Sequence, residues 1–408
     1  AFSYPCPAML KLKNTLFFIL ANIIVGLSSG ASYLAFAGPG SARRLCAHIR
    51  SEGIERLLVV TDTALRELGL VDRALEGLGD SNVNIEFYDG VTPDPDFDQV
   101  AQGTQTLRRH GSEAILAIGG GSSIDCAKVI AACANSDEDP RRWIGLGKVK
   151  HEVLPIFAIP TTAGTGSEAT MGAVISEPAT HEKGVITGRT LAVSATALDA
   201  TLQLGMPKPI TAATGMDALT HAVEAYICRW DRGTCREDAK RAIRMIFAAL
   251  PRAYEEGEDV DARETMSLAA WYAGIAINQV NVGTVHAIAH NLGAKYGIPH
   301  GVANAMVLPY VLEYCFTEAA PALAELAELI GVGHATATTT EKAQAFVDAV
   351  VALRDSVGIS STSELLRAED FDDLAVAAVK EAVMYFPPKL LTPDGARRIL
   401  SQVAGHQS

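Results

Sequence analysis

The apolar pattern of this chain changes near residue 205, and this change constrains the fold more than any other feature. From about Tyr33 to Leu204, short β-rich runs alternate with helical patterns, and each run is bounded by Gly, Pro or Asp. The clearest runs are "ERLLVVTD", "VNIEFYDG", "EAILAIGGG" and "LPIFAIPTT". Nearly continuous apolar strands that alternate with helices are typical of a parallel sheet covered on both faces. The first half is therefore predicted to be an α/β domain.

The strand signals stop after "QLGMPKPITAAT", where Pro207 and Pro209 mark a junction, and Ala-rich helical segments continue to the end. A chain of 408 residues with 49% hydrophobic residues can fill two cores. We predict an α/β plus all-α fold with an apolar N-terminal extension over 1–32, an α/β domain over 33–205 and an all-helical domain over 206–408.

The N-terminal extension has the outline of a signal peptide. Lys11 and Lys13 precede an apolar run from Leu16 to Leu27, and an A-x-A follows at Ala35 to Ala37. Cleavage there would remove "SYLAFAG", which has the pattern of the first strand, and the run is short for a membrane span. We favour an interfacial segment with weak membrane association through residues 10–30, and the cleaved signal is the alternative.

The net charge of −13 leaves no basic stripe to neutralise phosphates, so nucleic acid is not expected as a partner. The seven cysteines are odd in number and form no C-x-x-C pair, which indicates a reduced, cytoplasmic chain. A small molecule is the expected partner.

The stretch "AILAIGGGSSIDCAKVIAA" runs from a buried strand through Gly119, Gly120 and Gly121 into a helix. We expect Ser122 to cap a helix that begins near Ser123, with Asp125 completing a capping box. Free amides at a helix N-terminus attract anions, so a diphosphate could bind here. A tight turn without a ligand is the alternative.

Two further features follow predicted strands. In "IPTTAGTGSEAT", Thr161, Thr162 and Thr165 stand where open α/β sheets bind ligands, although an ordinary polar loop has the same composition. Asp62 ends "LLVVTD", where an acid can accept hydrogen bonds from ribose hydroxyls and favours NAD over NADP. A turn residue is the alternative for Asp62.

The helical half contains two pairs of residues spaced by four. Asp217 and His221 share one helix face, as do His286 and His290, and His300 follows in the loop "GIPHG". H-A-I-A-H lacks the glutamate of H-E-x-x-H, so a zinc protease is not supported. Asp217, His221 and His300 with one of the other two histidines would offer one oxygen and three nitrogens, a set suited to Fe²⁺ or Zn²⁺. A surface or capping interaction is the alternative for the Asp217 pair.

Taken together, these motifs resemble the iron-containing (group III) alcohol dehydrogenase family. The resemblance runs in order through "FAGPGS", "VVTD", "YDGVTPDP", "AIGGGSSIDCAK", "IPTTAGTGSEAT", "ATGMDALTHAVEAY" and "VHAIAHNLGAKYGIPHGVANAMVLP". It implies a Rossmann-like dinucleotide-binding α/β domain followed by a helical metal-binding domain, an arrangement shared with dehydroquinate synthase. It also implies a homodimer that uses NAD(H) and Fe²⁺, with Zn²⁺ as the alternative metal.

The resemblance also assigns roles to individual residues. It implies that His290 is a catalytic, proton-handling neighbour of the metal. The implied metal ligands are Asp217, His221, His286 and His300. The implied cofactor-binding residues are Asp62, Gly120, Gly121, Ser122, Ser123, Thr161, Thr162, Thr165 and Lys183.

This chain departs from the family pattern at two places. Pro93-Asp94-Pro95 stands where the family commonly has P-N-P, and "FPPKLLTP", Phe386 to Pro393, replaces the usual "NPR". The first departure affects an expected cofactor contact, and the second affects a region that shapes the substrate pocket.

The expected reaction is reversible hydride transfer between NAD(H) and a primary alcohol or its aldehyde, assisted by the metal as a Lewis acid. One alternative is a lyase or cyclase similar to dehydroquinate synthase, which would give no net NADH from simple alcohols. Another is a membrane-associated scaffold, which would bind neither metal nor NAD.

Overall fold

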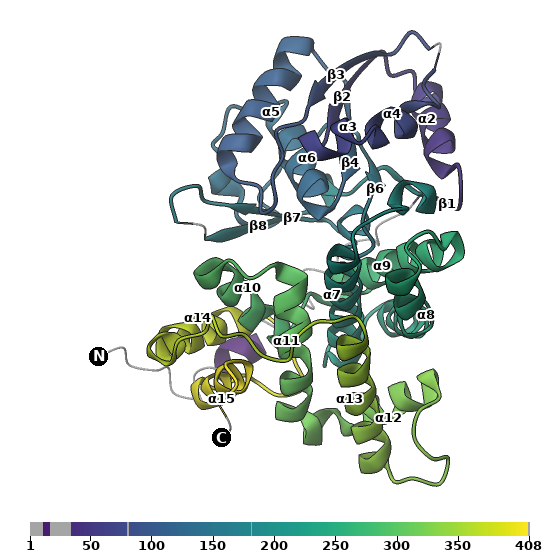
Figure 1. Cartoon of the computed structure of the whole chain (residues 1–408). Coiled ribbons are helices and arrows are strands. Elements are labelled where there is room, and N and C mark those ends of the chain that lie inside the picture. The colour runs from purple at the N-terminus through teal and green to yellow at the C-terminus, as the bar shows by residue number, and fades with distance from the viewer. Residues whose placement is uncertain (1–10, 17–33, 80, 181, 407–408) are drawn as a thin grey trace. The chain divides into compact units, whose positions relative to one another are not determined.

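The computed structural model describes residues 11–16, 34–79, 81–180 and 182–406 (Figure 1). The chain forms two compact units. The α/β unit comprises Ala31–Pro207 and Glu256–Gly274, and the helical unit comprises Lys208–Glu255, Ile275–Ser408 and the described part of Ala1–Gly30. The stretch Glu256–Gly274 thus clusters with the α/β unit, although it lies beyond residue 205 in the sequence.

A parallel sheet forms the centre of the α/β unit. Among the described residues it has six strands in the order β1-β9-β6-β4-β2-β3, and every pair is parallel. The strands are β1 (Ala35–Ala37), β2 (Arg56–Val60), β3 (Asn84–Tyr88), β4 (Ala114–Gly119), β6 (Ile156–Pro160) and β9 (Ala195–Leu198). The predicted mostly parallel sheet is confirmed, and "AFA" within the expected stretch "SYLAFAG" supplies its first strand.

Both faces of this sheet are buried, because successive side chains of a strand point to opposite faces. Leu58 and Val60 of β2 belong to one apolar cluster, and Leu57 and Val59 belong to the other. The first cluster includes α5 (Phe97–His110) and α6 (Gly121–Cys133), and the second includes α2 (Ser41–Ser51) and α4 (Leu70–Leu75). The short helix α3 (Thr63–Glu67) follows β2.

A small second sheet, which the sequence pattern did not indicate, completes this unit. Its order is β5-β8-β7, with β8 parallel to β5 and antiparallel to β7. Its strands are β5 (Gly145–Leu146), β7 (Gly172–Ser176) and β8 (Lys183–Thr187), and 3₁₀ turns are η1 (Pro140–Trp143), η2 (Ser167–Ala169), η3 (Arg189–Leu191) and η4 (Ala200–Gln203).

From residue 208 to residue 406 the described chain is helical, as predicted. The helices are α7 (Lys208–Ile227), α8 (Cys235–Glu255), α9 (Val260–Val280), α10 (Thr284–Tyr296), α11 (His300–Tyr314), α12 (Phe316–Ile330), α13 (Thr339–Ser356), η5 (Ala368–Asp370), α14 (Phe371–Ala382) and α15 (Pro393–Val403). α9 crosses the division between the units at residue 274.

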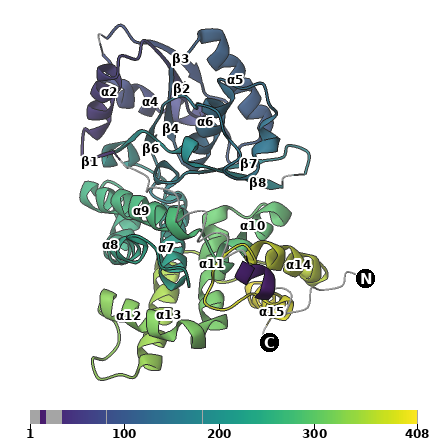
Figure 2. The same ribbon diagram turned by 180° about the vertical axis from the view of Figure 1, so that it is seen from behind.

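Most of the N-terminal apolar extension lies outside the described residues, and so does most of the membrane-associating segment expected over residues 10–30. Residues 11–16 form a short helical segment, drawn in dark purple beside α14 and α15 in both views (Figure 2). No helix within the described parts of the chain is long and apolar enough to cross a membrane.

Candidate active site

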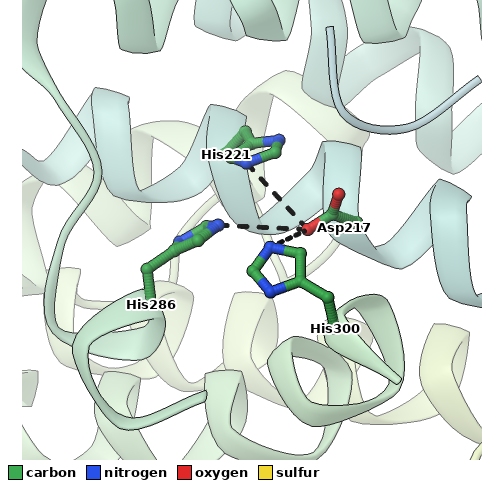
Figure 3. A group of neighbouring side chains, drawn as sticks. All are labelled: Asp217, His221, His286 and His300. Carbon is green, nitrogen blue, oxygen red and sulfur yellow. Dashed lines mark ion pairs between the residues drawn. The ribbon is translucent and has the colours of Figure 1, made fainter. Parts of the chain in front are cut away.

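Four side chains from three helices of the helical unit converge on one point. Asp217 and His221 lie one turn apart on α7, His286 lies on α10, and His300 is the first residue of α11 (Figure 3). Each offers one ligand atom, and these atoms lie within 4.8 Å of one another. Asp217 Oδ1 is 3.4 Å from His300 Nε2 and 3.9 Å from the Nε2 atoms of His221 and His286.

The electrostatics of this cluster favour a cation. Burial raises the pKa of the Asp217 carboxyl, but the neighbouring His221, His300 and His286 outweigh it, and the pKa lies below its usual value. Burial, and then the neighbouring His221 and His290, hold the pKa of His286 well below its usual value. Asp217 is therefore held as a carboxylate and His286 as a neutral imidazole, and both are forms that can bind a cation.

Asn304 on α11 provides an independent test of whether a cation fits. Its fully buried amide nitrogen lies 2.7 Å from Asp217 Oδ1, 3.1 Å from His286 Nε2 and 3.2 Å from His300 Nε2. An amide nitrogen has two hydrogens, one fewer than the acceptors around it. Asn304 Oδ1 is also buried without a hydrogen-bond partner among the described residues. The site thus has an excess of acceptors, which a divalent cation would satisfy.

Glu224, also on α7, holds the His286 ring from behind. Its Oε2 accepts hydrogen bonds from His286 Nδ1 at 2.6 Å and from Gly283 N at 2.8 Å. Its Oε1 accepts from Val285 N at 2.6 Å. A carboxylate on the far nitrogen of a histidine fixes the tautomer and leaves Nε2 free to bind a metal.

Glu224 and Asn304 were not among the residues predicted from the sequence. Their spacing contained a signal, because Glu224 follows His221 by three residues and Asn304 follows His300 by four, so each shares a helix face with a ligand candidate. What the spacing did not show was that they reach partners on other helices.

His290 lies beside the cluster without being one of its four members. Its ring stacks on that of His300, with centroids 5.2 Å apart, and stands edge-on to that of His286 at 5.6 Å. The pair His286 and His290, spaced by four, thus divides into one member of the cluster and one neighbour.

The predicted cofactor-binding residues lie mostly at one edge of the parallel sheet. Asp62, Gly119 and Thr161 stand at the carboxyl ends of β2, β4 and β6, which are adjacent strands. Gly119 pairs in register with Pro160, and Thr161 N donates to Gly119 O at 3.0 Å. Open α/β sheets bind their ligands at this edge.

The glycine loop (Gly119–Gly121, between β4 and α6) lies close to the threonine loop (Thr161–Thr170, between β6 and β7). A Cβ on Gly121 would lie 2.6 Å from Thr165 Cγ2, and one on Gly120 would lie 3.3 Å from Thr162 Oγ1. Gly119 has φ 153°, and a Cβ there would collide with the side chain of Ser123, which is buried. Side chains at these positions would force the two loops apart, so the close approach depends on glycine.

The predicted capping box of this helix is wrong. α6 begins at Gly121 with Gly120 as its N-cap, and no side chain caps it. The partly buried Asp125 instead accepts hydrogen bonds from Ser167 Oγ and, at 2.8 Å, from Val174 N. The first-turn amides therefore remain open, which suits an anion better than the predicted box would.

The buried side chain of Lys128 binds backbone carbonyls of the threonine loop. Lys128 Nζ donates to the carbonyls of Ser167 and Gly172 at 2.7 Å and of Thr170 at 2.9 Å. The ammonium thus binds two carbonyls near the end of this loop and the carbonyl of Gly172, the first residue of β7, so it anchors the end of the loop.

The two remaining cofactor candidates have partners of their own. Asp62 is the N-cap of α3, and its Oδ1 accepts from Leu65 N at 2.9 Å. Lys183 on β8 donates to Asp94 Oδ1 at 2.6 Å. Asp94 is the residue that departs from the family's P-N-P, and its φ of 55° is one that Asn and Asp tolerate best. The departure thus supplies Lys183 with an ion-pair partner.

The chain matches two family models in succession. Residues 34–200 match the model described as iron-containing alcohol dehydrogenase. Residues 211–404 match the model described as Fe-containing alcohol dehydrogenase family, C-terminal.

Curated proteins and solved structures give the same result. The 1,3-propanediol dehydrogenase of Citrobacter freundii is 36% identical over 358 residues, which cover 87% of this chain and 92% of that protein. The NAD-dependent methanol dehydrogenase of Bacillus methanolicus is 31% identical, over 89% of this chain and 96% of that protein. A crystal structure of 1,3-propanediol oxidoreductase superposes with a TM-score of 0.88 at 35% identity and covers 92% of this chain and all of that one.

The resemblance predicted from the motifs is thus confirmed over both halves, as are the predicted oxidoreductase class and fold. This chain belongs to the iron-containing alcohol dehydrogenase family.

Proposed function

We propose that this chain transfers a hydride reversibly between NAD(H) and a small primary alcohol or its aldehyde, at a metal site formed by Asp217, His221, His286 and His300. The observation that carries the proposal is the convergence of four ligand atoms within 4.8 Å in a buried cluster with too few hydrogen-bond donors. One carboxylate and three imidazoles suit Fe²⁺, the metal of this family, and also Zn²⁺.

A bound cation would supply Lewis-acid chemistry, by polarising the oxygen of the alcohol or aldehyde. The chain's own residues do the rest. Glu224 keeps the His286 proton on Nδ1, and Asn304 lies against Asp217. His290, beside His300, accepts the alcohol proton and returns it in the reverse direction.

The α/β unit binds the cofactor in this proposal. The open N-terminus of α6 with Gly120, Gly121, Ser122 and Ser123 receives the diphosphate, and the Thr161, Thr162 and Thr165 loop with Lys183 receives the nicotinamide side. Asp62 has Oδ1 on Leu65 N and Oδ2 for a ribose hydroxyl. We also expect the chain to be cytoplasmic and to form a homodimer. Light scattering of the purified protein tests the oligomeric state.

The names of the relatives, a 1,3-propanediol and a methanol dehydrogenase, support a short alcohol as substrate. The lyase alternative and the scaffold alternative are not favoured by membership in a family of alcohol dehydrogenases.

The test is metal analysis of anaerobically purified protein together with an NADH assay over a panel of alcohols and aldehydes. The proposal predicts about one metal ion per chain and NADH formation from short primary alcohols. A metal-loaded protein that formed no NADH from any alcohol, and consumed none with any aldehyde, would contradict it.

A further inference from the structure

The histidine beside the metal cluster is held by a carboxylate from another helix. His290 Nδ1 lies 2.7 Å from Oε1 of Glu381, which stands near the end of α14. The His290 side chain is 17% exposed and that of Glu381 is 25% exposed, so both are largely shielded from water. Glu381 was not among the site residues predicted from the sequence.

The same carboxylate oxygen receives a second hydrogen bond. Tyr385, just beyond α14, donates its hydroxyl to Glu381 Oε1 at 2.7 Å. Burial, and then the charge of Glu381, raise the pKa of Tyr385 well above its usual value, so this hydroxyl remains a donor. An oxygen that accepts from Tyr385 can also accept from His290 only if the imidazole carries its hydrogen on Nδ1.

Tyr385 belongs to the segment 383–387, in which four backbone carbonyls accept hydrogen bonds from Asn14 and Arg229. Asn14 Nδ2 donates to Val383 O at 2.9 Å and to Tyr385 O at 2.8 Å. Arg229 donates from N to Phe386 O at 2.9 Å and from Nε to Pro387 O at 2.8 Å. Arg229 also donates to Asn14 Oδ1 at 2.6 Å, which links the two fastening residues.

This fastened segment leads into "FPPKLLTP", where the chain departs from the family's usual "NPR". The Tyr385 hydroxyl is therefore held in a defined position, because both the backbone and the side chain of Tyr385 form hydrogen bonds.

We propose that Glu381 is a positioning residue for His290, and that Tyr385 holds the Glu381 carboxylate in place, so that His290 presents Nε2 as its proton-accepting nitrogen. The inference rests on the proton-handling role proposed for His290. A carboxylate that fixes the tautomer of a catalytic imidazole is a recurring arrangement in enzymes. Without Glu381 the ring is free to turn and to place its hydrogen on either nitrogen.

The test compares four variants of the full chain: His290→Asn, Glu381→Leu, Glu381→Gln and Tyr385→Phe. Glu381→Leu removes the acceptor and should lower kcat about 10- to 100-fold, a loss in the lower range for proton transfer by a positioned side chain. KM and metal content should stay near the wild-type values, and the solvent deuterium isotope effect on kcat should increase. Glu381→Gln keeps an acceptor oxygen and should recover most of kcat.

Tyr385→Phe should lower kcat a few-fold, because it leaves the carboxylate less firmly held. A matched control is Tyr226→Phe, since the Tyr226 hydroxyl also donates to a glutamate, Glu325, and Tyr226 is not part of the metal cluster. This control should leave kcat unchanged. If Glu381→Leu does not fold, the contrast between Tyr385→Phe and Tyr226→Phe decides.

A spectroscopic measurement on the metal-free chain is independent of turnover. In protein labelled with ¹⁵N-histidine, the signals that His290→Asn removes should show hydrogen on Nδ1 in the wild type and a mixture of tautomers in Glu381→Leu. Wild-type kcat or an unchanged tautomer in Glu381→Leu would overturn the inference, provided that His290→Asn is impaired. Full activity of His290→Asn would instead overturn the role proposed for His290 itself.

Discussion

Glu224 Oε2 lies 2.6 Å from His286 Nδ1, and the same carboxylate accepts the backbone N–H groups of Gly283 and Val285. One buried acid on α7 therefore orients a ligand candidate and caps the start of α10, the helix that carries it. Three donors thus surround the Glu224 carboxylate: two backbone N–H groups and the Nδ1–H of His286.

Changing Glu224 to Gln should weaken metal binding about 10- to 100-fold, the usual effect of removing a partner that orients a ligand. The amide would turn a donor toward one of the three donors that now surround the carboxylate. Competition between the full chain and a chromogenic chelator for Zn²⁺ or Co²⁺ measures the effect. Glu237→Gln, an exposed acid on α8, is the control, and equal affinities in the two variants would contradict the assigned role.

Changing Asp62 to Gly should increase use of NADP relative to NAD by about tenfold or more, because the acid proposed to repel a 2′-phosphate is gone. Asp62 also caps α3 through Leu65 N. Glycine at an N-cap costs only a few tenths of a kcal/mol, so the fold should survive. Asp62→Ser keeps a capping oxygen and loses the charge, and should shift the ratio of kcat/KM values in the same direction. An unchanged ratio in both variants would show that Asp62 serves only as a cap.

The stability of the chain should depend on pH through Glu168 in the threonine loop. Burial raises the pKa of Glu168 from its usual 4.5 to about 7. The folded chain then binds more protons than the unfolded chain between these values, so the free energy of unfolding falls as pH rises from about 4.5 to about 7. Burial lowers the pKa of Lys128 from its usual 10.5 to about 8. The unfolded chain then binds more protons than the folded chain between these values, so through Lys128 the free energy of unfolding rises as pH rises from about 8 to about 10.5.

Glu168→Gln removes the acidic-side dependence. The variant should gain stability relative to the wild type between pH 5 and pH 8, by about 1.4 kcal/mol for each unit of the pKa shift. Denaturant unfolding at the two pH values measures the difference, with the exposed Glu182→Gln as control. A stability difference that is the same at pH 5 and pH 8 would contradict the raised pKa of Glu168 in the folded chain.

Local patterns in the sequence predicted most of the fold. Continuous apolar runs gave the buried strands β2, β4 and β6, and the end of these runs gave the change to helices near Lys208. The sheet β5-β8-β7 was not predicted, because its strands are short and partly exposed and resemble loops in the sequence. Ser122 was wrongly expected to cap α6, because the sequence did not show that Asp125 accepts hydrogen bonds from Ser167 and Val174 instead of completing a capping box.

The candidate site was predicted less completely than the fold. The resemblance named Asp217, His221, His286 and His300, and the structure brings these four together. It did not reveal Glu224, Asn304 or Glu381, each of which acts across helices. Glu381 reaches His290 from 91 residues away, and no periodic pattern in the sequence encodes such a pairing.

The central claim is that these four side chains bind the metal that the reaction requires. His300→Ala removes one ligand from a residue at the start of α11 whose side chain is 29% exposed, so the fold should remain intact. Metal analysis and the NADH assay on the anaerobically purified variant test the claim directly, with the exposed His334→Ala as control. We predict loss of most of the metal and activity in His300→Ala and none in His334→Ala. A His300→Ala protein with full metal content and full activity would contradict the assignment.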